Sequence, residues 1–310
     1  MLPIRKYIKK PALIITGLKN HVFRMYRFIE PMMSDEAFLK FIYPQYIGSK
    51  LDLNKPKTFN EKLQWLKLND RKPEHIMMVD KFAVKRFIAD TIGEQYVIPT
   101  FGVYQSFEDI EFANLPDNFV LKTTHGGGGN GVVICRDKEK FDKIRAKKII
   151  SQNLKEDISV YYKEWPYKGV PRLIMAEKYI SDKNDELKDY KFFCFNGIPK
   201  FLKVDFGRFS EHHANYYDLD WNLLPFGEVV CPPDFTHKEK QPNNFAKMVD
   251  IAQQLSVGLN FVRVDLYNVD GKIYFGELTF FPASGFGRFT PREWDAKIGK
   301  MLSLPNDILA

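Results

Sequence analysis

The chain has 310 residues and a formal charge of +7, from 46 basic and 39 acidic side chains. Its length leaves room for one large domain or two to three small lobes, and its 45% hydrophobic and 27% charged residues are ordinary for a soluble globular protein. The positive charge favours anionic partners such as nucleotides, sugar phosphates or an acidic membrane face. It is too mild to indicate DNA binding, and no nucleic-acid motif is present.

Two features bear on the compartment. Cys135, Cys194 and Cys231 lack metal-site spacing, and two of them lie in apolar strand-like runs, so reduced core thiols and a cytoplasmic location are expected. Residues 1–29 hold seven basic and no acidic residues, which suits either peripheral contact with an anionic membrane leaflet or a solvated helix packed on the domain. The apolar run at 12–15 is too short to span a membrane.

Helical patterns dominate the first third of the chain. Residues 1–72 are predicted to form a basic, mainly helical N-terminal segment, in which a capping box at Thr58–Glu61 begins one helix. The next helix is predicted to run from about Glu74 to Ile92, before Gly93. Lys81 and Lys85 lie one turn apart on it, so they share a face.

A glycine-rich loop between two short strands is the central motif. Apolar, β-prone residues at 119–121 and 132–135 flank it, and Lys122 follows on the first strand. Five glycines in six residues cannot serve a core, but they let backbone N–H groups approach phosphate oxygens. The loop consists of Gly126, Gly127, Gly128, Gly129, Asn130 and Gly131.

The spacing of this loop fits G-x-G-x-x-G, which is a weak signal alone. A dinucleotide site would need a helix directly after the loop, where this chain has the β-branched residues Val132, Val133 and Ile134. A P-loop would need Gly-Lys-Ser or Gly-Lys-Thr, and neither occurs in the chain. A protein kinase would carry its lysine on the following strand and would need His-Arg-Asp, which is absent. From the loop alone, a surface turn without a ligand remains an equal alternative.

The rest of the chain alternates in the way that antiparallel strands do. A surface helix is predicted over residues 138–155, a helix over 244–255, and a last helix from a capping box at Thr290–Glu293. Asn196-Gly197 predicts a hairpin turn. Strands are predicted over residues 100–104, 173–180, 189–195, 198–204, 214–219, 261–267 and 272–279.

Acidic residues stand out on the late strands. Asp265 and Glu277 lie among apolar neighbours on the two strands of the last hairpin, and a buried carboxylate is costly unless it is paired or binds a cation. Two such groups can share Mg²⁺. Arg263 points to the same sheet face as Asp265, so a purely structural ion pair is an equal alternative. Glu177 lies at the end of an earlier strand, where it either binds a ligand or forms a solvent-exposed pair with Lys178.

Taken in order, these motifs resemble the ATP-grasp superfamily, which includes D-alanine–D-alanine ligase and biotin carboxylase. The resemblance runs from about Glu74 to the C-terminus. It is greatest to the TupA-like branch, linked to teichuronopeptide and other acidic polysaccharide biosynthesis, because of Phe275–Thr279 and the long basic N-terminus. It implies an α+β ATP-grasp domain over residues 73–310, whose two α/β lobes with antiparallel sheets clamp ATP around a hinge near 176–181.

The resemblance also implies a site for ATP and Mg²⁺. Arg263 and Lys122 match catalytic cations, and Asp265 and Glu277 match the metal carboxylates. The family usually has asparagine two residues after the metal glutamate, whereas this chain has Thr279, a weaker ligand, which puts the second metal position in doubt. The implied nucleotide contacts are Lys81, Lys122, the loop 126–131, Glu177, the hinge residues Lys178, Tyr179 and Ile180, and Asp189 for the ribose.

The implied activity is that of a ligase that joins a carboxylate to an amine through an acyl phosphate and releases ADP and phosphate. A uronic acid of a capsular or cell-wall glycan is the expected carboxylate, with acceptor contacts sought around Lys203, Arg208, His212 and His213. The alternatives are a sugar kinase of the same fold, a glycosyltransferase using Asp218-Leu219-Asp220, here interpreted as a hairpin turn, and a non-catalytic nucleotide-binding scaffold.

Overall fold

The computed structural model describes residues 32–127, 129, 131–182, 187–207 and 212–305. The chain divides into two compact units, residues 1–50 and 51–310. The first contains helix α2 (Asp35–Ile47), which Ser34 caps and Gly48 ends in a left-handed conformation. Residues 51–72 group with the second unit, whereas the sequence prediction placed them in the N-terminal segment. The basic residues 1–29 lie outside the described ranges.

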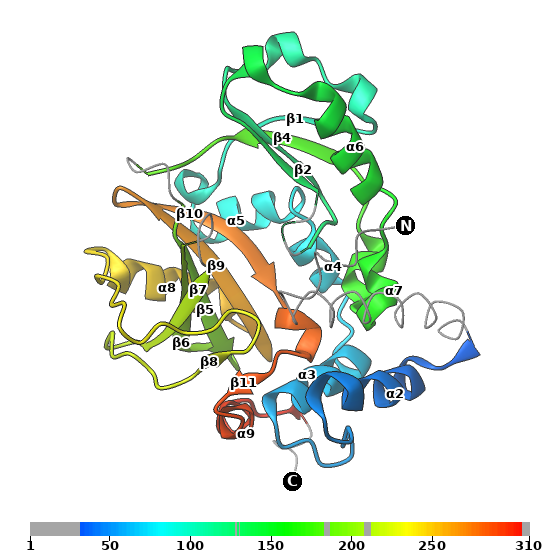
Figure 1. Cartoon of the computed structure of the whole chain (residues 1–310), viewed down its shortest axis with the longest axis vertical. Helices are drawn as coiled ribbons and strands as arrows, with labels where there is room; N and C mark the ends of the chain where they lie inside the picture. The colour runs from blue at the N-terminus through cyan, green and yellow to red at the C-terminus, as the bar shows by residue number, and fades with distance from the viewer. Residues whose placement is uncertain (1–31, 128, 130, 183–186, 208–211, 306–310) are drawn as a thin grey trace, which may run out of the picture. The chain divides into compact units, whose positions relative to one another are not determined.

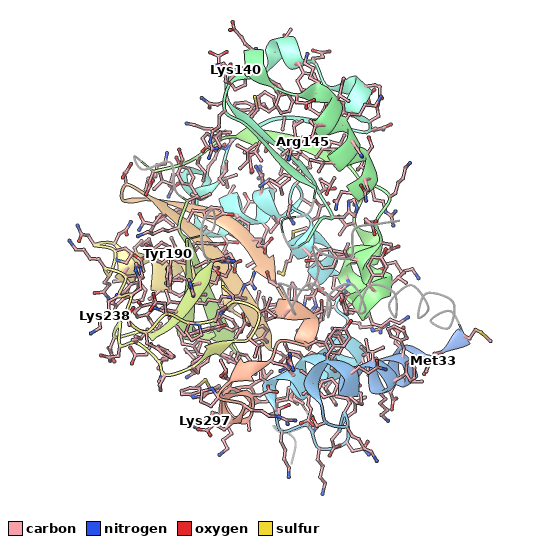
Figure 2. The ribbon with its side chains drawn as sticks, viewed as in Figure 1. Met33, Lys140, Arg145, Tyr190, Lys238 and Lys297 are labelled. Atoms are coloured by element: carbon pink, nitrogen blue, oxygen red, sulfur yellow. The ribbon has the colours of Figure 1, made fainter. Side chains whose placement is uncertain are left out.

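The second unit contains two antiparallel sheets, and the smaller one holds the glycine loop. Its strands follow the order β1 (Thr100–Tyr104), β4 (Ile174–Lys178), β2 (Phe119–Thr123) and β3 (Val132–Cys135). Helix α6 (Lys143–Asn153) packs on it through Ala146 and Ile150 (Figure 1). Arg145, on the same helix, and Lys140, in the 3₁₀ turn before it, extend into solvent (Figure 2). The two strands predicted around the loop are confirmed.

The larger sheet has five strands and confirms the predicted antiparallel series. Its order is β10 (Lys272–Thr279), β9 (Phe261–Val269), β5 (Asp189–Phe195), β6 (Ile198–Phe206) and β7 (His213–Asp218). Asn196 and Gly197 both have positive φ, as the predicted hairpin turn requires. Residues 179–188 connect β4 of the smaller sheet to β5 of the larger one.

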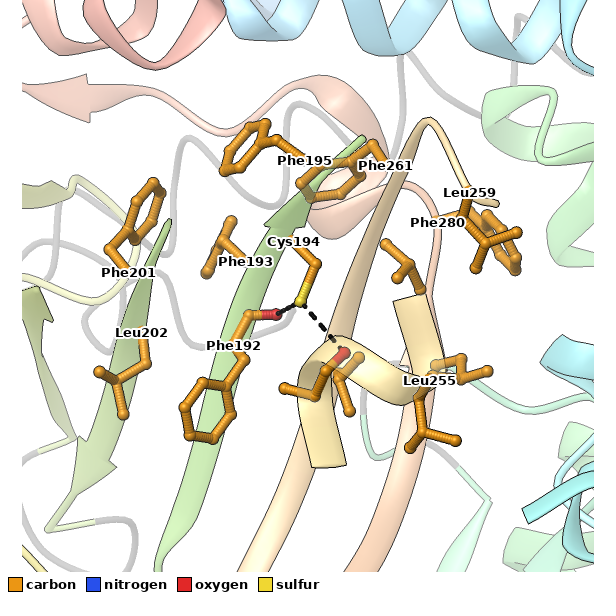
Figure 3. Close-up of a cluster of buried hydrophobic side chains, with 14 of the residues drawn as sticks. Phe192, Phe193, Cys194, Phe195, Phe201, Leu202, Leu255, Leu259, Phe261 and Phe280 are labelled. Atoms are coloured by element: carbon orange, nitrogen blue, oxygen red, sulfur yellow. Dashed lines mark hydrogen bonds between the residues drawn. The ribbon is translucent and has the colours of Figure 1, made fainter. Parts of the chain in front are cut away.

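The two faces of the larger sheet differ in chemistry. Helix α8 (Phe245–Ser256) covers an apolar face, where the thiol of Cys194 donates to the carbonyls of Phe192 and Ala252 (Figure 3). On the opposite face, Phe193 packs at one end of the strands in a ring cluster with Phe59 of helix α3 (Phe59–Asn69). Charged side chains follow at the other end of the same face. All three cysteines are free and buried, as predicted.

The predicted single helix from Glu74 to Ile92 is wrong. It is two helices, α4 (Glu74–Val79) and α5 (Val84–Ile92), with a turn between them. The carboxylate of Asp80 accepts from the backbone N–H groups of Phe82 and Ala83 at 2.8 and 3.2 Å, which competes with continued helix. In this turn the N–H of Lys81 donates to the carbonyl of Thr124, so the break places Lys81 beside the glycine loop.

One of the two predicted capping boxes is confirmed. Thr58 and Glu61 form it at the start of α3. The box at Thr290–Glu293 is wrong, because Thr290 pairs in strand β11 (Phe289–Thr290) with β8 (Gly227–Glu228), and helix α9 (Glu293–Gly299) starts without a side-chain cap. The remaining elements are α7 (Ile158–Tyr162) and 3₁₀ turns at Glu94–Tyr96, Phe107–Asp109, Phe112–Asn114, Trp165–Gly169 and Pro282–Gly285. None of the helices in the described ranges has the length and apolar content of a transmembrane span.

Candidate active site

A buried glutamate flanked by two lysines forms the part of the site on the smaller sheet. Glu177 on β4 lies directly opposite Val120 of β2 and is only 3% exposed. Its Oε1 accepts from Lys85 Nζ at 2.5 Å, and its Oε2 is ion-paired with Lys122. Glu177 is therefore not the exposed partner of Lys178, which was the alternative from sequence.

The charge of Glu177 gives a pH-dependent contribution to stability. Burial alone would raise the pKa of Glu177, but Lys122 and Lys85 hold it below its ordinary value. A carboxylate with a lowered folded-state pKa stabilises the fold above its unfolded pKa of about 4.3, and this contribution is lost as the pH falls through the folded value.

We therefore expect Glu177→Gln to lower the free energy of unfolding by about 3 kcal/mol at neutral pH, because it removes the counter-charge of two half-buried lysines, Lys85 and Lys122. The difference from wild type should shrink as the pH falls below about 4.3. Urea unfolding over this pH range measures it, with Glu293→Gln, at an exposed ion pair with Lys297, as the control. A difference that stays constant with pH would contradict the ion-pair account.

The glycine loop is anchored at both ends. Lys81 Nζ donates to the carbonyl of Gly126, and the carbonyl of Gly131 accepts from the N–H of Thr123 at 3.2 Å. Gly131 has φ of 72°, and a Cβ there would overlap the side chain of Asn153. Gly127 is half-buried and Gly129 exposed, while Gly128 and Asn130 lie outside the described residues.

Strands β9 and β10 bring three oxygen-bearing side chains to one guanidinium. Arg263 Nη2 lies 2.6 Å from Asp265 Oδ2, 3.3 Å from Glu277 Oε1 and 3.0 Å from Thr279 Oγ1. Glu277 pairs with Asp265 across the ladder because a bulge after Phe275 shifts the register. Gly276 occupies the bulge, where a Cβ would meet the carbonyl oxygen of Asp265 at 3.0 Å. The predicted common face is confirmed.

Lys81 connects the two groups of residues. Its Nζ lies 3.7 Å from Glu277 Oε2 while it also bonds to the glycine loop. Burial raises the pKa of Glu277, but the charges of Lys81, Arg263 and Lys191 outweigh it and bring this pKa to about 2. Glu277 therefore stays anionic, and Lys81, in the turn between α4 and α5, bridges the glycine loop of the smaller sheet and strand β10 of the larger one.

Asp189 lies within a further charged cluster on the larger sheet. It is ion-paired with Lys191, two residues along β5, and Lys191 Nζ also lies 3.1 Å from Asp205 and 3.5 Å from Asp265. Asp189, Asp205 and Asp265 are each less than 5% exposed. The predicted ribose acid is thus on the same face as the predicted metal carboxylates, with a lysine between them.

The predicted hinge residues do not join this charge cluster. Lys178 is exposed, and its N–H donates to the carbonyl of Pro99 at 2.9 Å. The phenolic oxygen of Tyr179 accepts from Arg136 Nε at 3.2 Å, and Ile180 is half-buried. What these residues share with the site is their position, directly after Glu177 in the connection between the sheets.

Sequence reasoning missed two lysines. The sequence predicts that Lys85 shares a helical face with Lys81, but Lys81 lies in the turn between α4 and α5, and Lys85 on α5 binds Glu177 instead of the loop. Lys191 alternates with Asp189 at strand spacing, which was a usable signal for a shared face. Lys85 is half-buried and Lys191 is buried, and each contacts a predicted site acid.

The predicted acceptor region lies farther along the same sheet. Lys203 Nζ lies 2.7 Å from Glu228 Oε2, and Arg208 is outside the described residues. Asp205, His212 and Cys231 bring three ligand atoms within 4.8 Å of one another. Asp205 is already neutralised by Lys191 and by Lys203, whose Nζ lies 3.8 Å from it. A dication there would face two ammonium groups.

A pocket of about 540 Å³ lies elsewhere. It is lined by Tyr190 (labelled in Figure 2), Asn244, Asn268 and neighbouring residues, and none of its lining residues is a predicted site residue. Tyr190 points to the opposite side of β5 from Asp189 and Lys191, because side chains alternate along a strand. This pocket therefore does not belong to the charged cluster.

The sequence profile of the TupA-like ATP-grasp family matches residues 61–303. The chain belongs to this family. The resemblance inferred from the motifs is confirmed, and so is the α+β ATP-grasp fold with its two antiparallel sheets.

Similar solved structures include three ligases. D-alanine–D-alanine ligase from Bacillus anthracis complexed with ATP is 16% identical, with 66% of this chain and 54% of that chain covered and a TM-score of 0.39. D-alanine–D-alanine ligase from Helicobacter pylori is 12% identical, with 79% of this chain and 69% of that chain covered and a TM-score of 0.43. Phosphoribosylamine–glycine ligase from Thermotoga maritima is 15% identical, with 68% of this chain and 50% of that chain covered and a TM-score of 0.42. The chain thus spans about half the length of two of them. No curated protein matches it.

The residues of this TupA-like ATP-grasp protein fit a hard cation. Carboxylate and hydroxyl oxygens of Asp265, Glu277 and Thr279 converge on one position, where a positively charged nitrogen of Arg263 now lies. Such oxygens are the ligands that Mg²⁺ prefers. Lysines near a glycine-rich backbone loop likewise suit the phosphates of a nucleotide.

Proposed function

We propose that this chain is an ATP-dependent carboxylate–amine ligase. A substrate carboxylate takes the terminal phosphoryl group of ATP, and an amine then displaces phosphate from the acyl phosphate to give an amide. The double contact of Lys81 is the observation that carries the proposal, because one cation joins the glycine loop to Glu277. Membership of the TupA-like ATP-grasp family supports it.

Fixed positive charges are what phosphoryl transfer needs from a protein. Lys81, Lys122 and Arg263 supply them in the proposed site. Burial opposes the charge on Arg263, but Asp265 and Glu277 raise the pKa of its guanidinium above the ordinary value. Bound Mg²⁺, held by Asp265 and Glu277 with Thr279 as a weaker ligand, would supply further positive charge beside the phosphates. Closure of the loop over residues 126–131 would exclude water that hydrolyses an acyl phosphate.

The nucleotide base and ribose have proposed contacts as well. Glu177, buried and already bonded to two lysines, is the proposed acceptor for the adenine amino group, with Lys178, Tyr179 and Ile180 beside it. Asp189 is the proposed ribose acid. Residues 176–181 are the proposed hinge, since the chain passes there from the smaller sheet to the larger one.

For the substrate, we propose a uronic acid of a capsular or cell-wall polysaccharide and an amino acid as the amine. The excess of basic residues favours an anionic glycan. The basic residues 1–29 would suit peripheral contact with the anionic inner face of a membrane.

The test is ADP release with Mg-ATP, a panel of carboxylates that includes glucuronic acid and UDP-glucuronic acid, and a mixture of amino acids. We expect one carboxylate to stimulate ADP release and hydroxylamine to trap its acyl phosphate as a hydroxamate. Mass spectrometry of the product then identifies the amide. If no carboxylate stimulates ADP release, the proposed ligase activity is wrong.

A glycosyltransferase is the alternative from another class. The Asp218-Leu219-Asp220 sequence that would bind its metal closes a turn instead, since Asp218 Oδ1 accepts from the N–H groups of Asp220 and Asn222 at 3.0 and 2.7 Å. Stabilisation by UDP-sugars rather than by ATP in a thermal-shift panel would favour the glycosyltransferase. A sugar kinase of the same fold would give a phosphorylated sugar and no hydroxamate.

A further inference from the structure

Three consecutive left-handed residues follow the end of strand β10. Ala283, Ser284 and Gly285 have φ of 48°, 54° and 64°. For alanine and serine this conformation costs on the order of 1 kcal/mol each, and such strain is concentrated at functional sites. The segment follows closely in sequence on Thr279, the last residue of β10 and part of the proposed active site.

Two fully buried polar side chains of helix α3 hold this segment. Lys67 Nζ donates to the carbonyl of Ser284 at 2.7 Å, to the carbonyl of Tyr162 at 2.8 Å and to Gln64 Oε1 at 2.9 Å. Gln64 Nε2 donates to the carbonyls of Ser284 and Gly285 at 3.2 and 2.6 Å. Both side chains are 0% exposed. All three protons of Lys67 are therefore used on neutral oxygens.

The strained backbone directs one hydroxyl at a buried acid. Ser284 Oγ donates to Glu164 Oε1, and Glu164 is 9% exposed. Among the residues that the structure describes, Ser284 is the one donor to this carboxylate, and Glu164 Oε2 receives none. Lys67 does not form an ion pair with it. A buried carboxylate with one oxygen fixed by a hydrogen bond and the other without a donor is suited to binding a cationic ligand.

Charges of the proposed active site act on Glu164. Burial raises the pKa of Glu164, and Glu277 raises it further, while Lys67, the hydroxyl of Ser284 and Arg263 lower it, with a net rise. The imidazole ring of His75 lies 5.9 Å from the ring of Trp165 and 4.3 Å from the ring of Phe280, so the residues next to Glu164 and Thr279 pack on the same side chain. Lys81 and Arg263 suit the anionic substrates, whereas Glu164 offers the opposite charge at the side of the site near Ser284.

We propose that Glu164 binds the amine substrate as its ammonium ion and is the base that removes its proton, with Ser284 as a positioning residue. This rests on the proposed ligase function. The carboxylate of Glu164 takes one proton from the ammonium, and the freed lone pair attacks the acyl carbon of the acyl phosphate. The carbon–oxygen bond to phosphate then breaks, phosphate leaves with that electron pair, and it accepts the second proton from the amide nitrogen.

The test compares two nucleophiles with the carboxylate selected by the ADP-release panel. Amino acids arrive as ammonium ions and need a base, whereas hydroxylamine is already unprotonated at neutral pH. Glu164→Gln keeps the volume and the acceptor for Ser284. We expect it to lower amide formation by about 10²-fold, with hydroxamate formation at the wild-type rate. Glu293→Gln, on the exposed side of α9, is the control and should change neither rate.

The outcomes separate the two proposals. Equal losses with both nucleophiles, or no loss with either, would show that Glu164 is not the base, while the ligase function would stand. Absence of hydroxamate from wild type with every carboxylate would overturn the ligase function and this inference together. If the glutamine variant does not fold, Ser284→Ala provides the same comparison, and a selective loss of amide formation is again the expected result.

Discussion

Replacing Glu277 with glutamine is expected to lower kcat for carboxylate-dependent ADP release by about 10³-fold. Glu277 lies at the junction of the site, 3.7 Å from Lys81 and 3.3 Å from Arg263. The neutral amide would lose a proposed Mg²⁺ ligand and leave both cations without this counter-charge. Because the side chain is 39% exposed, glutamine should be tolerated by the fold.

The measurement is steady-state ADP release, with thermal unfolding to confirm that the variant is folded. Glu293→Gln removes an acid of the same type from an exposed ion pair and should leave the rate unchanged. Wild-type turnover in Glu277→Gln would contradict the proposed metal site. Absence of any turnover in the wild type would instead favour the non-catalytic scaffold for which Thr279 was the only sequence signal.

Replacing Lys122 with methionine is expected to raise KM for ATP by about 10²-fold, since a charge-assisted hydrogen bond contributes about 1.5–3 kcal/mol. Lys122 is held on β2 by its ion pair with Glu177, so its ammonium is oriented before nucleotide binds. Methionine keeps the length of the side chain without the charge. The loss should therefore fall on ATP binding more than on the fold.

Calorimetric titration with ATP and steady-state kinetics measure this effect. Lys140→Met is the matched control, because Lys140 extends into solvent at the far end of the smaller sheet's lobe (Figure 2). An unchanged KM in Lys122→Met would remove this lysine from the nucleotide site. A loss of kcat without a change in KM would instead assign it to the transition state.

Local sequence rules predicted the strands and the common faces well. Alternation placed Arg263 and Asp265 on one side of β9, and the hairpin brought Glu277 next to them. The five-glycine loop between two strands could also be predicted, since backbone freedom and strand propensity depend on the residues of the segment itself.

What could not be predicted depends on partners distant in sequence. The apolar pattern continues through residues 74–92, and only the competition of Asp80 for local N–H groups, together with the contact of Lys81 with Thr124, shows why the helix breaks. Lys85 likewise finds Glu177 across 92 residues. Glu164 meets Ser284 across 120 residues, through a backbone conformation that no propensity favours.

The bulge at Gly276 decides which side of the sheet receives the acid. In an unbroken ladder Gly276 would pair with Asp265, and Glu277 would lie opposite Val264 in place of Asp265. Its carboxylate would then enter the hydrocarbon layer between the sheet and α8. One residue without a side chain thus sets the parity of the last strand, because the extra position at Gly276 puts Phe275 and Glu277 on opposite sides of the sheet although they are two residues apart.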